Sequence, residues 1–328
     1  MLMANRSCQT YMSNFPSTAW NWTFGMINAT NSITATFENA VALLIMVWYK
    51  ECHSISDRIF TSLIITDLLA GLTTAPLYSV QLFSKDISSN CTVEQVRRSS
   101  SAILIAASAL TVATISYDRF LHITKLNNYN KHMTKGKSHT LILLCWVVPI
   151  SLPILRIFAE TQNYYVIAFS SLMALVFVIM IVFYVLILIS IRKRGSWRRR
   201  SVQIEKQRMK TVKITITIIT CYVLMGLPVM IPLILMPFQI EPETMGAIYV
   251  SAVTLNMLNS SANPVIYYYR NPSIRKCFKK LMRLDSTHDR TSSISRNNPA
   301  AARENQMAKD RPITIIETVE TINLKARI

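Results

Sequence analysis

The sequence predicts an all-α membrane protein: a bundle of seven transmembrane helices followed by a short amphipathic helix on the cytosolic surface. Hydrophobic residues make up 51% of the 328 residues, and they are collected in seven long blocks with almost no charge. A helix needs about 20 apolar residues to cross a bilayer. In lipid every backbone group must be bonded internally, which favours helices. Buried helices of a large soluble domain are the alternative, but uncharged runs of this length are rare in soluble folds.

The seven blocks follow one another with short connections, except for a long basic loop between the fifth and the sixth. In chain order they are a run around Ile33–Tyr49, the stretch between Arg58 and Lys85, Ser99–Tyr117, and four uncharged runs enclosed by Lys137 and Arg156, Glu160 and Arg192, Lys213 and Glu241, and Glu243 and Arg270. We therefore expect an extracellular glycosylated N-terminus at 1–28, the transmembrane domain at 29–270, the amphipathic surface helix at 271–282 and a disordered cytosolic tail at 283–328.

The distribution of basic residues predicts the orientation in the membrane. With the N-terminus outside, only five of the 35 Lys and Arg residues face the exterior: Arg6, Lys85, Arg97, Arg98 and Arg156. The positive-inside rule then places the C-terminus in the cytosol of a multi-pass plasma-membrane protein. The net charge of +18 faces an anionic inner leaflet and requires no nucleic-acid partner.

The predicted exterior carries sites for covalent modification. Asn-X-Ser/Thr sequons, which accept N-glycans, begin at Asn5, Asn21, Asn28 and Asn90. Of the six cysteines, only Cys8 and Cys91 face the oxidising exterior. They are the pair that could form a disulfide.

The predicted surface helix has two distinct faces. Apolar side chains recur at helical spacing, opposite a face of lysine and arginine, at Ile274, Cys277, Phe278, Leu281 and Met282. Cys277 is either an acylation site or a plain apolar contact. The tail beyond it carries a hydroxyl cluster that suits phosphorylation by kinases, although inert tails look similar: Ser286, Thr287, Thr291, Ser292, Ser293 and Ser295.

Polar side chains inside the membrane are costly, so each needs a partner or a purpose. Asp67 lies in the middle of the second block, and Ser108, Asn259 and Asn263 lie within the third and seventh. Carboxylate, hydroxyl and amide oxygens suit Na⁺, with Asp67 as metal ligand, or a water network. Hydrogen bonding between helices is the alternative. No catalytic constellation is present, so we expect neither an enzyme nor a cofactor beyond this candidate allosteric Na⁺.

Motifs at matching depths make the sequence similar to the class A, rhodopsin-like G-protein-coupled receptors. The third block ends in "YDRF" (117–120) and the seventh in "NPVIY" (263–267). The resemblance covers nearly all of residues 29–282. Single residues that also fit the family pattern are Asn39, Asp67, Trp146, Tyr184 and Pro228.

The resemblance implies two networks and a set of partners. In this family the arginine matching Arg119 is held by its neighbouring acid until the sixth helix swings outward and a heterotrimeric G protein binds. The implied switch comprises Asp118, Arg119, Phe120, Tyr184, Pro228, Asn263, Pro264 and Tyr267. The implied sodium network comprises Asn39, Asp67, Ser108, Asn259 and Asn263. Arrestin and receptor kinases are the further partners, acting at the tail.

The sequence departs from the family pattern at several positions. Gly226 stands where the family usually has a tryptophan, and the second outer loop lacks the usual cysteine. Met257 replaces the Schiff-base lysine of photoreceptors, and Ser101 replaces the aspartate of amine receptors. The pair Glu38-Asn39, with no proline in the fifth block, resembles the branch of melanocortin, lysophospholipid, cannabinoid and adenosine receptors.

Two arginines give the clearest indication of ligand chemistry. Arg97 and Arg98, at the predicted outer mouth, suit an anionic head group; alternatively, they mark the helix end and extend to the interface. The remaining pocket candidates are mostly apolar, which suits either a lipophilic ligand or plain packing: Ser101, Ile105, Met225, Val229, Val253 and Met257.

We therefore expect a receptor that binds an extracellular ligand and activates heterotrimeric G proteins. A non-signalling seven-helix scavenger, or a dimer partner of another receptor, is the alternative. Gly226 and the missing loop cysteine favour that alternative, whereas the intact Asp118-Arg119 pair argues against it. A transporter or channel lacks support, since the sequence shows no internal repeat and no continuous polar face.

Overall fold

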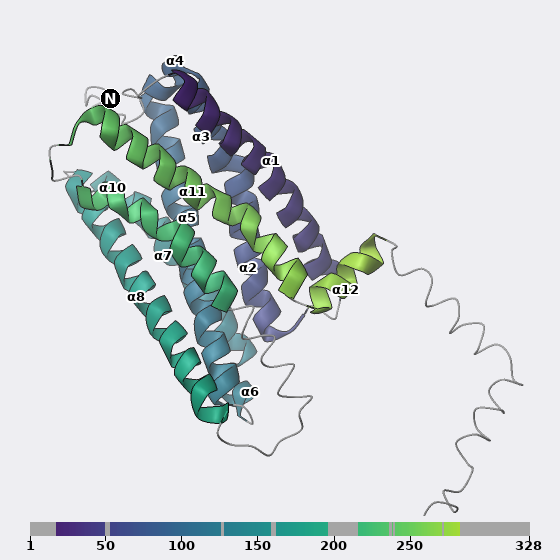
Figure 1. Cartoon of the computed structure of the whole chain (residues 1–328). Coiled ribbons are helices and arrows are strands. Elements are labelled where there is room, and N and C mark those ends of the chain that lie inside the picture. The colour runs from purple at the N-terminus through teal and green to yellow at the C-terminus, as the bar shows by residue number, and fades with distance from the viewer. Residues whose placement is uncertain are drawn as a thin grey trace, which may run out of the picture. The chain divides into compact units, whose positions relative to one another are not determined.

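The computed structural model describes residues 18–49, 53–125, 128–158, 162–195, 216–235, 238, 240–270 and 272–282. This part of the chain consists of helices and contains no strand (Figure 1). The crossings are α1 (Thr18–Trp48); α2 (Ile55–Leu69) continued by the π-helix η3 (Ala70–Thr74) and α3 (Ala75–Phe83); α5 (Cys91–Thr124); α7 (Lys135–Phe158); α8 (Gln162–Gly195); a sixth crossing made of 216–226, the 3-10 helix η4 (Leu227–Val229) and α10 (Met230–Leu235); and α11 (Pro242–Arg270). The short helices are α4 (Lys85–Ser89), α6 (Tyr129–His132) and α12 (Pro272–Leu281).

The predicted fold class, an all-α seven-helix membrane bundle, is confirmed. Six of the crossings are long and apolar enough to span a membrane. The seventh, α11, has 29 residues, but several asparagines and serines lower its hydropathy. All seven lie in one unit, Met1–Cys277, and the chain from Phe278 onward forms a second.

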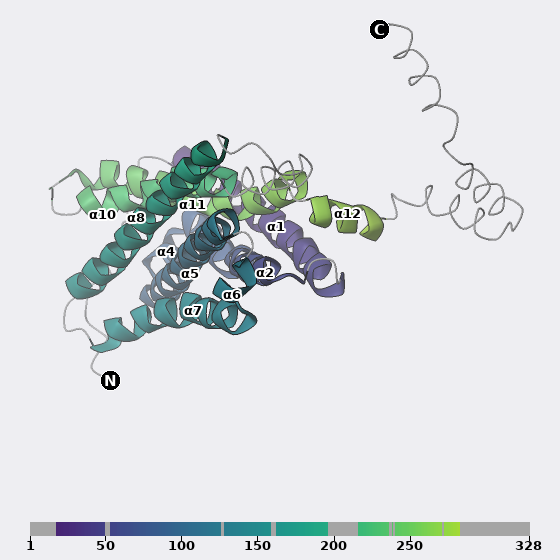
Figure 2. The same ribbon diagram turned by 90° about the horizontal axis from the view of Figure 1, so that it is seen from below.

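Helix α5 occupies the centre of the bundle, where it contacts α2, α7 and α8, while α1 contacts α3 and α11 (Figure 2). Helix α8 is apolar on every side, and its Leu175, Val178 and Ile181 are exposed. This is the pattern of a membrane-spanning helix that packs against the bundle on one side, where Met173, Phe177 and Met180 are buried, and faces hydrocarbon on the other. The polar side chains named below are buried between the helices instead.

The start of the first helix differs from the expected boundary at residue 29. Helix α1 begins at Thr18 because aromatic side chains in the presumed tail pack against the bundle. The rings of Trp22 and Phe83 lie 5.0 Å apart, and Gly25 faces Phe83 so closely that a Cβ would lie 2.5 Å from that ring. Polar residues lie between these aromatics and lower the hydropathy of the segment, so hydropathy alone did not predict a helix there.

A second close approach joins α1 to the π-helix η3. A Cβ on Gly71 would lie 2.7 Å from Thr36 Oγ1 and 2.9 Å from the Thr36 backbone nitrogen, so only glycine fits. Ser32 Oγ donates to the Gly71 carbonyl at 2.7 Å. The π-helix follows Asp67 by three residues, and π-turns of this kind often occur at functional sites.

Candidate functional site

The centre of the bundle holds a buried carboxylate with polar neighbours. Asp67 is 2% exposed, and its Oδ2 accepts a hydrogen bond of 2.8 Å from Asn263 Nδ2. A cavity of about 20 Å³ lies beside Asp67, and its walls include Ser108 and Asn259, which is room for about one water-sized sphere. The structure therefore brings Asp67, Ser108, Asn259 and Asn263 together, as the sequence predicted.

Several oxygens around this cavity lack a hydrogen-bond partner within the described part of the chain. They are Ser101 Oγ, Ser108 Oγ, Asn259 Oδ1 and Asn263 Oδ1. An amide oxygen can only accept, so a water or a cation has to satisfy it. A carboxylate surrounded by hydroxyl and amide oxygens is a donor set that fits Na⁺. The chemistry of the site thus suits the predicted ion as well as a water network.

Pro264 leaves a gap in the backbone bonding of α11, and α1 closes it. Proline has no N–H, so the carbonyl of Ser260, four residues earlier, lacks its helical donor. The amide of Asn39, which is fully buried, donates to this carbonyl at 3.0 Å and to the Ala35 carbonyl at 2.8 Å. Asn39 therefore fastens α1 to α11 at the proline rather than lining the cavity itself.

Two further asparagines extend this seam between α1 and α11, and the sequence did not predict their role. Asn31 Nδ2 donates to the Met257 carbonyl at 2.9 Å, while its Oδ1 accepts from Ser261 Oγ at 2.7 Å. Asn28 Nδ2 donates to Thr254 Oγ1 at 2.8 Å, and Asn28 is fully buried. The expectation of a glycan on Asn28 is therefore corrected, because its amide is used inside the bundle.

The sixth crossing meets α5 and α8 where the family tryptophan is missing. Gly226 is buried, and a Cβ there would lie 3.3 Å from Phe177 Cζ, so Phe177 of α8 fills the space beside it. One turn earlier, Tyr222 lines the polar cavity and donates to the Ile105 carbonyl at 3.1 Å. The chain turns into the 3-10 helix η4 at Pro228, as expected of a helix interrupted by proline.

At the far end of α5, Asp118 and Arg119 are both buried between helices. Asp118 accepts from Ser56 Oγ at 2.8 Å and from Tyr129 Oη at 2.6 Å. Arg119 Nε lies 3.5 Å from Asp118 Oδ2, too far for a strong bond. The guanidinium also lies over the ring of Phe60, 5.4 Å from its centroid. The acid is thus well bonded, while the arginine is held loosely.

Helix α6 contributes to this end through an aromatic stack. Tyr129 stacks on His122 with ring centroids 3.7 Å apart. Burial, and then the Asp118 carboxylate, raise the pKa of Tyr129 above its usual range. Its hydroxyl therefore keeps its proton and remains a donor to Asp118. Sequence reasoning missed Tyr129, Ser56 and Phe60 because they come from other helices.

The other predicted switch residues are spread along the bundle, with Asn263 bonded to Asp67 in the polar core and Pro228 in the sixth crossing. The Phe120 ring lies 5.7 Å from that of Phe183, and Tyr184 follows on α8, partly buried. Pro264 is buried in α11, and the Tyr267 side chain lies outside the described set. The structure thus joins Asp118 and Arg119 directly and distributes the remaining members over α5, α8, the sixth crossing and α11.

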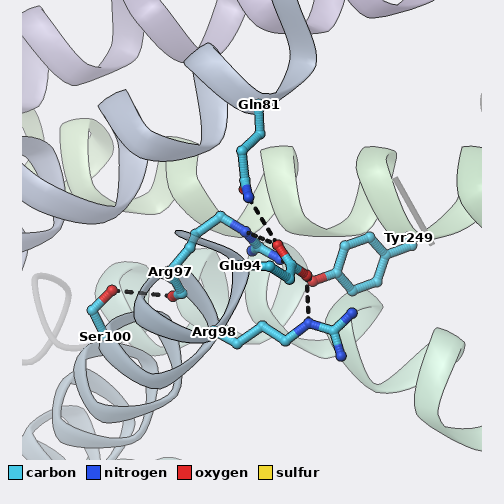
Figure 3. Close-up of polar contacts among 6 residues, drawn as sticks. All are labelled: Gln81, Glu94, Arg97, Arg98, Ser100 and Tyr249. Carbon is cyan, nitrogen blue, oxygen red and sulfur yellow. Dashed lines mark hydrogen bonds and ion pairs between the residues drawn. The ribbon is translucent and has the colours of Figure 1, made fainter. Parts of the chain in front are cut away.

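At the opposite end of α5, the two arginines that were expected to bind an anionic ligand are already paired with Glu94. Arg97 is 1% exposed; its Nε and Nη2 donate to Glu94 at 3.0 and 2.8 Å, and Arg98 Nε also donates to Glu94 (Figure 3). Arg97 neither extends to the interface nor presents an open anion site. Glu94 at i−3 and i−4 from the arginines was the signal in the sequence. From other helices, Gln81 donates to Glu94, and Tyr249 accepts from Arg97 (Figure 3).

The predicted pocket residues do not form one pocket. Ser101, Ile105 and Met257 line the small polar cavity, and Val253, with Met257, belongs to an apolar core between α3 and α11. Met225 and Val229 are only partly buried. A larger apolar groove of about 350 Å³ lies elsewhere, between the sixth crossing and α11, lined by Pro228, Ile231, Ala247, Ile248, Ser251, Ala252 and Leu255.

The predicted modification sites fall in different environments. Asn90 is exposed and caps α5, with its Oδ1 accepting from the backbone of Thr92 and Val93, whereas Asn21 is half-buried in α1. Cys277 is 1% exposed, which favours the apolar contact over acylation. Asn5, Cys8, the Cys8–Cys91 pairing and the tail hydroxyls at 286–295 lie outside the described residues or depend on them.

Comparison with known proteins agrees with this geometry. The model of the "7 transmembrane receptor (rhodopsin family)" matches residues 38–166 and 157–267. Relatives include "Rhodopsin, GQ-coupled" of Mizuhopecten yessoensis (23% identical, covering 82% of this chain and 62% of the relative). "Melanocortin receptor 5" (23%, 77% and 82%) and "Neuropeptide FF receptor 2" (21%, 74% and 68%), both of Mus musculus, are similar as well.

The chain thus spans 62% of the rhodopsin that it matches, and the near-equal identities single out no branch. The match to the family model runs over most of the chain and contains the buried Asp67, the Asp118-Arg119 pair and the proline-interrupted sixth and seventh crossings. Together these findings confirm the resemblance to the rhodopsin-like receptors, and the chain belongs to the rhodopsin family of seven-transmembrane receptors.

Proposed function

We propose that this chain is a plasma-membrane receptor, with its N-terminus outside and its C-terminus in the cytosol, that binds an extracellular ligand and activates heterotrimeric G proteins. The observation that carries the proposal is the loose hold on Arg119. Asp118 is already bonded to Ser56 and Tyr129, and Arg119 lies 3.5 Å from it. The guanidinium therefore competes with two other donors for the acid, and it is placed to turn to a partner at the cytosolic end.

The test is G-protein activation in transfected cells without ligand, across the main G-protein classes and at matched surface expression. We expect a basal signal that Arg119→Ala removes. Arg58→Ala is the matched control, because Arg58 lies at the same end of the bundle and bonds His139 rather than the acid. Absence of nucleotide exchange with every G-protein class, with or without ligand, would contradict the proposal.

We also propose that Na⁺ occupies the polar cavity when the receptor rests. Asp67 would supply the charge, and Ser108 and Asn259 would supply the oxygens that lack partners in the described part of the chain. An ion there would draw α2, α5 and α11 together through one shared ligand set. This chain's own contribution is the carboxylate, which Asn263 orients through its 2.8 Å bond.

Further partners follow from the same proposal. Receptor kinases and arrestin would act on the tail, and the amphipathic α12 would lie against membrane lipids. The ligand would be lipophilic, or would carry an acidic group near Arg98, whose side chain is 21% exposed. The Arg97 guanidinium lies over the ring of Tyr78, a member of the apolar core between α3 and α11, which supports the lipophilic part.

A second candidate function, a non-signalling member of the family, is favoured by one observation. Phe177 of α8 occupies the space beside Gly226. The sixth crossing therefore lacks the tryptophan side chain through which a ligand would move it, and a phenylalanine of another helix takes up the room. A wild-type protein that reaches the surface, binds ligand and activates no G protein would support this candidate.

A further inference from the structure

The outer ends of α3, α5 and α11 meet in one buried polar cluster centred on Glu94, separate from the polar cavity and the cytosolic switch (Figure 3). Glu94 is 1% exposed. Its Oε1 accepts from Arg97 and Arg98, and its Oε2 accepts from Arg97 and from Gln81, the last two at 3.0 Å. These four bonds fill the acceptor capacity of a carboxylate.

The cluster holds α3 and α5 together through several contacts. Gln81 of α3 donates to Glu94, and the Arg97 guanidinium lies over the ring of Tyr78 of α3, 5.3 Å from its centroid. A buried ion pair offsets its desolvation only when its geometry is good and its other polar atoms are bonded, and a bidentate arginine meets that condition. We therefore expect these two outer ends to behave as one body.

The connection from this cluster to α11 is weaker. Arg97 Nη2, which already donates to Glu94, also donates to Tyr249 Oη of α11 at 3.2 Å. This bond is longer than either bond from Arg97 to Glu94, and its acceptor is a neutral hydroxyl rather than a carboxylate. Arg97 is 1% exposed and is bonded to both Glu94 and Tyr249, so a molecule that reaches its guanidinium has to displace one of these partners.

We propose that the Arg97–Tyr249 bond is the latch of the outer mouth. A ligand enters between α5 and α11 by parting Tyr249 from Arg97, while α3 and α5 stay joined. The group that completes the opened site is a hydrogen-bond acceptor oxygen, which takes the place of the tyrosine hydroxyl on Arg97 Nη2. A cationic group finds no acceptor on Glu94, because that carboxylate is filled.

The latch is tested by the accessibility of the space beneath it, which requires neither a known ligand nor a G protein. Ser101 lies one turn below Arg97, is 8% exposed and tolerates Ser101→Cys as a near-isosteric change. In full-length receptor with Cys8 and Cys91 replaced by serine, we would measure the rate at which a charged, membrane-impermeant thiol reagent modifies this cysteine.

Tyr249→Phe removes only the hydroxyl and should raise the modification rate about ten-fold or more, the ratio expected for one lost hydrogen bond to a charged group. Tyr268→Phe, the same change at the other end of α11, should leave the rate unchanged. Gln81→Leu should also leave it near the wild-type value. An unchanged rate in Tyr249→Phe, or an equal rise in either control, would overturn the latch.

The inference rests on the proposed function only in assuming that an extracellular molecule enters this mouth. The latch and the signalling function can fail separately. A faster modification rate in Tyr249→Phe together with no G-protein signal would support the latch and contradict the signalling function. Basal signalling together with an unchanged modification rate in Tyr249→Phe would support the signalling function and contradict the latch.

Discussion

Asn39 satisfies a backbone carbonyl that Pro264 leaves without a donor, and removing it tests the link between the two residues. In Asn39→Ala the Ser260 carbonyl stays buried and loses its 3.0 Å bond. A buried unsatisfied carbonyl costs about 1–3 kcal/mol, and the space left by the smaller side chain adds to this. We expect a loss of about 2–4 kcal/mol, which lowers the midpoint of thermal unfolding by roughly 2–4 °C per kcal/mol. The measurement is thermal unfolding of purified receptor in mild detergent.

A double-mutant cycle with Pro264→Ala separates the hydrogen bond from the lost volume. Alanine at 264 restores an N–H that can reach the Ser260 carbonyl along the helix, so Asn39→Ala should cost less in that background. The volume change is common to both backgrounds and cancels, leaving a coupling of about 1–2 kcal/mol. An equal cost of Asn39→Ala in both backgrounds would refute the reasoning, because Asn39 would then act independently of the proline.

Three further predictions concern the other parts of the site. Tyr129→Phe removes a 2.6 Å bond to Asp118 and frees that carboxylate to hold Arg119 more tightly; we expect basal nucleotide exchange to fall at least several-fold, and a rise would contradict this. Replacing choline chloride by sodium chloride should raise the thermal midpoint of the wild type but leave Asp67→Asn unchanged; an equal response in both would exclude Asp67 as the ion's ligand. Gly226→Trp should reduce surface expression, because Phe177 lies 3.3 Å from the position of a Cβ at 226 and so occupies the space that an indole would need; adding Phe177→Ala should restore expression, and failure of that rescue would mean that Phe177 is not the obstacle.

The polar core was predictable from the sequence because the bilayer leaves few options. A carboxylate in the middle of an apolar block has to find partners inside the protein, and the polar residues at matching depth were few. Asp67 and Asn263 do meet directly. The role of Asn39 was harder to predict from the sequence. Asn39 does not line the cavity but donates to the Ser260 carbonyl, because Pro264 has no N–H to offer that carbonyl.

The end of α5 that carries Glu94 shows where local patterns mislead. Arg97 and Arg98 looked like free cations at a helix end, yet Glu94 lies within one turn of both and pairs with them. The sequon at Asn28 matched its pattern fully, but the side chain faces Thr254. A sequence pattern records which chemical groups are present, and does not record which way a helix is rotated.

The sequence by itself determined the fold class and the family, and it placed Asp67, Ser108, Asn259 and Asn263 at one level of the bundle. A run of about 20 apolar residues matches the thickness of the bilayer. A proline interrupts the hydrogen bonds of its own helix, and both features can be recognised without knowing how the helices pack. Only the tertiary structure decided that Tyr249 closes on Arg97, that Phe177 fills the space beside Gly226, and that α1 begins at Thr18. Those contacts join residues from different helices, and they depend on the rotation and tilt that the packing of the whole bundle imposes on each helix.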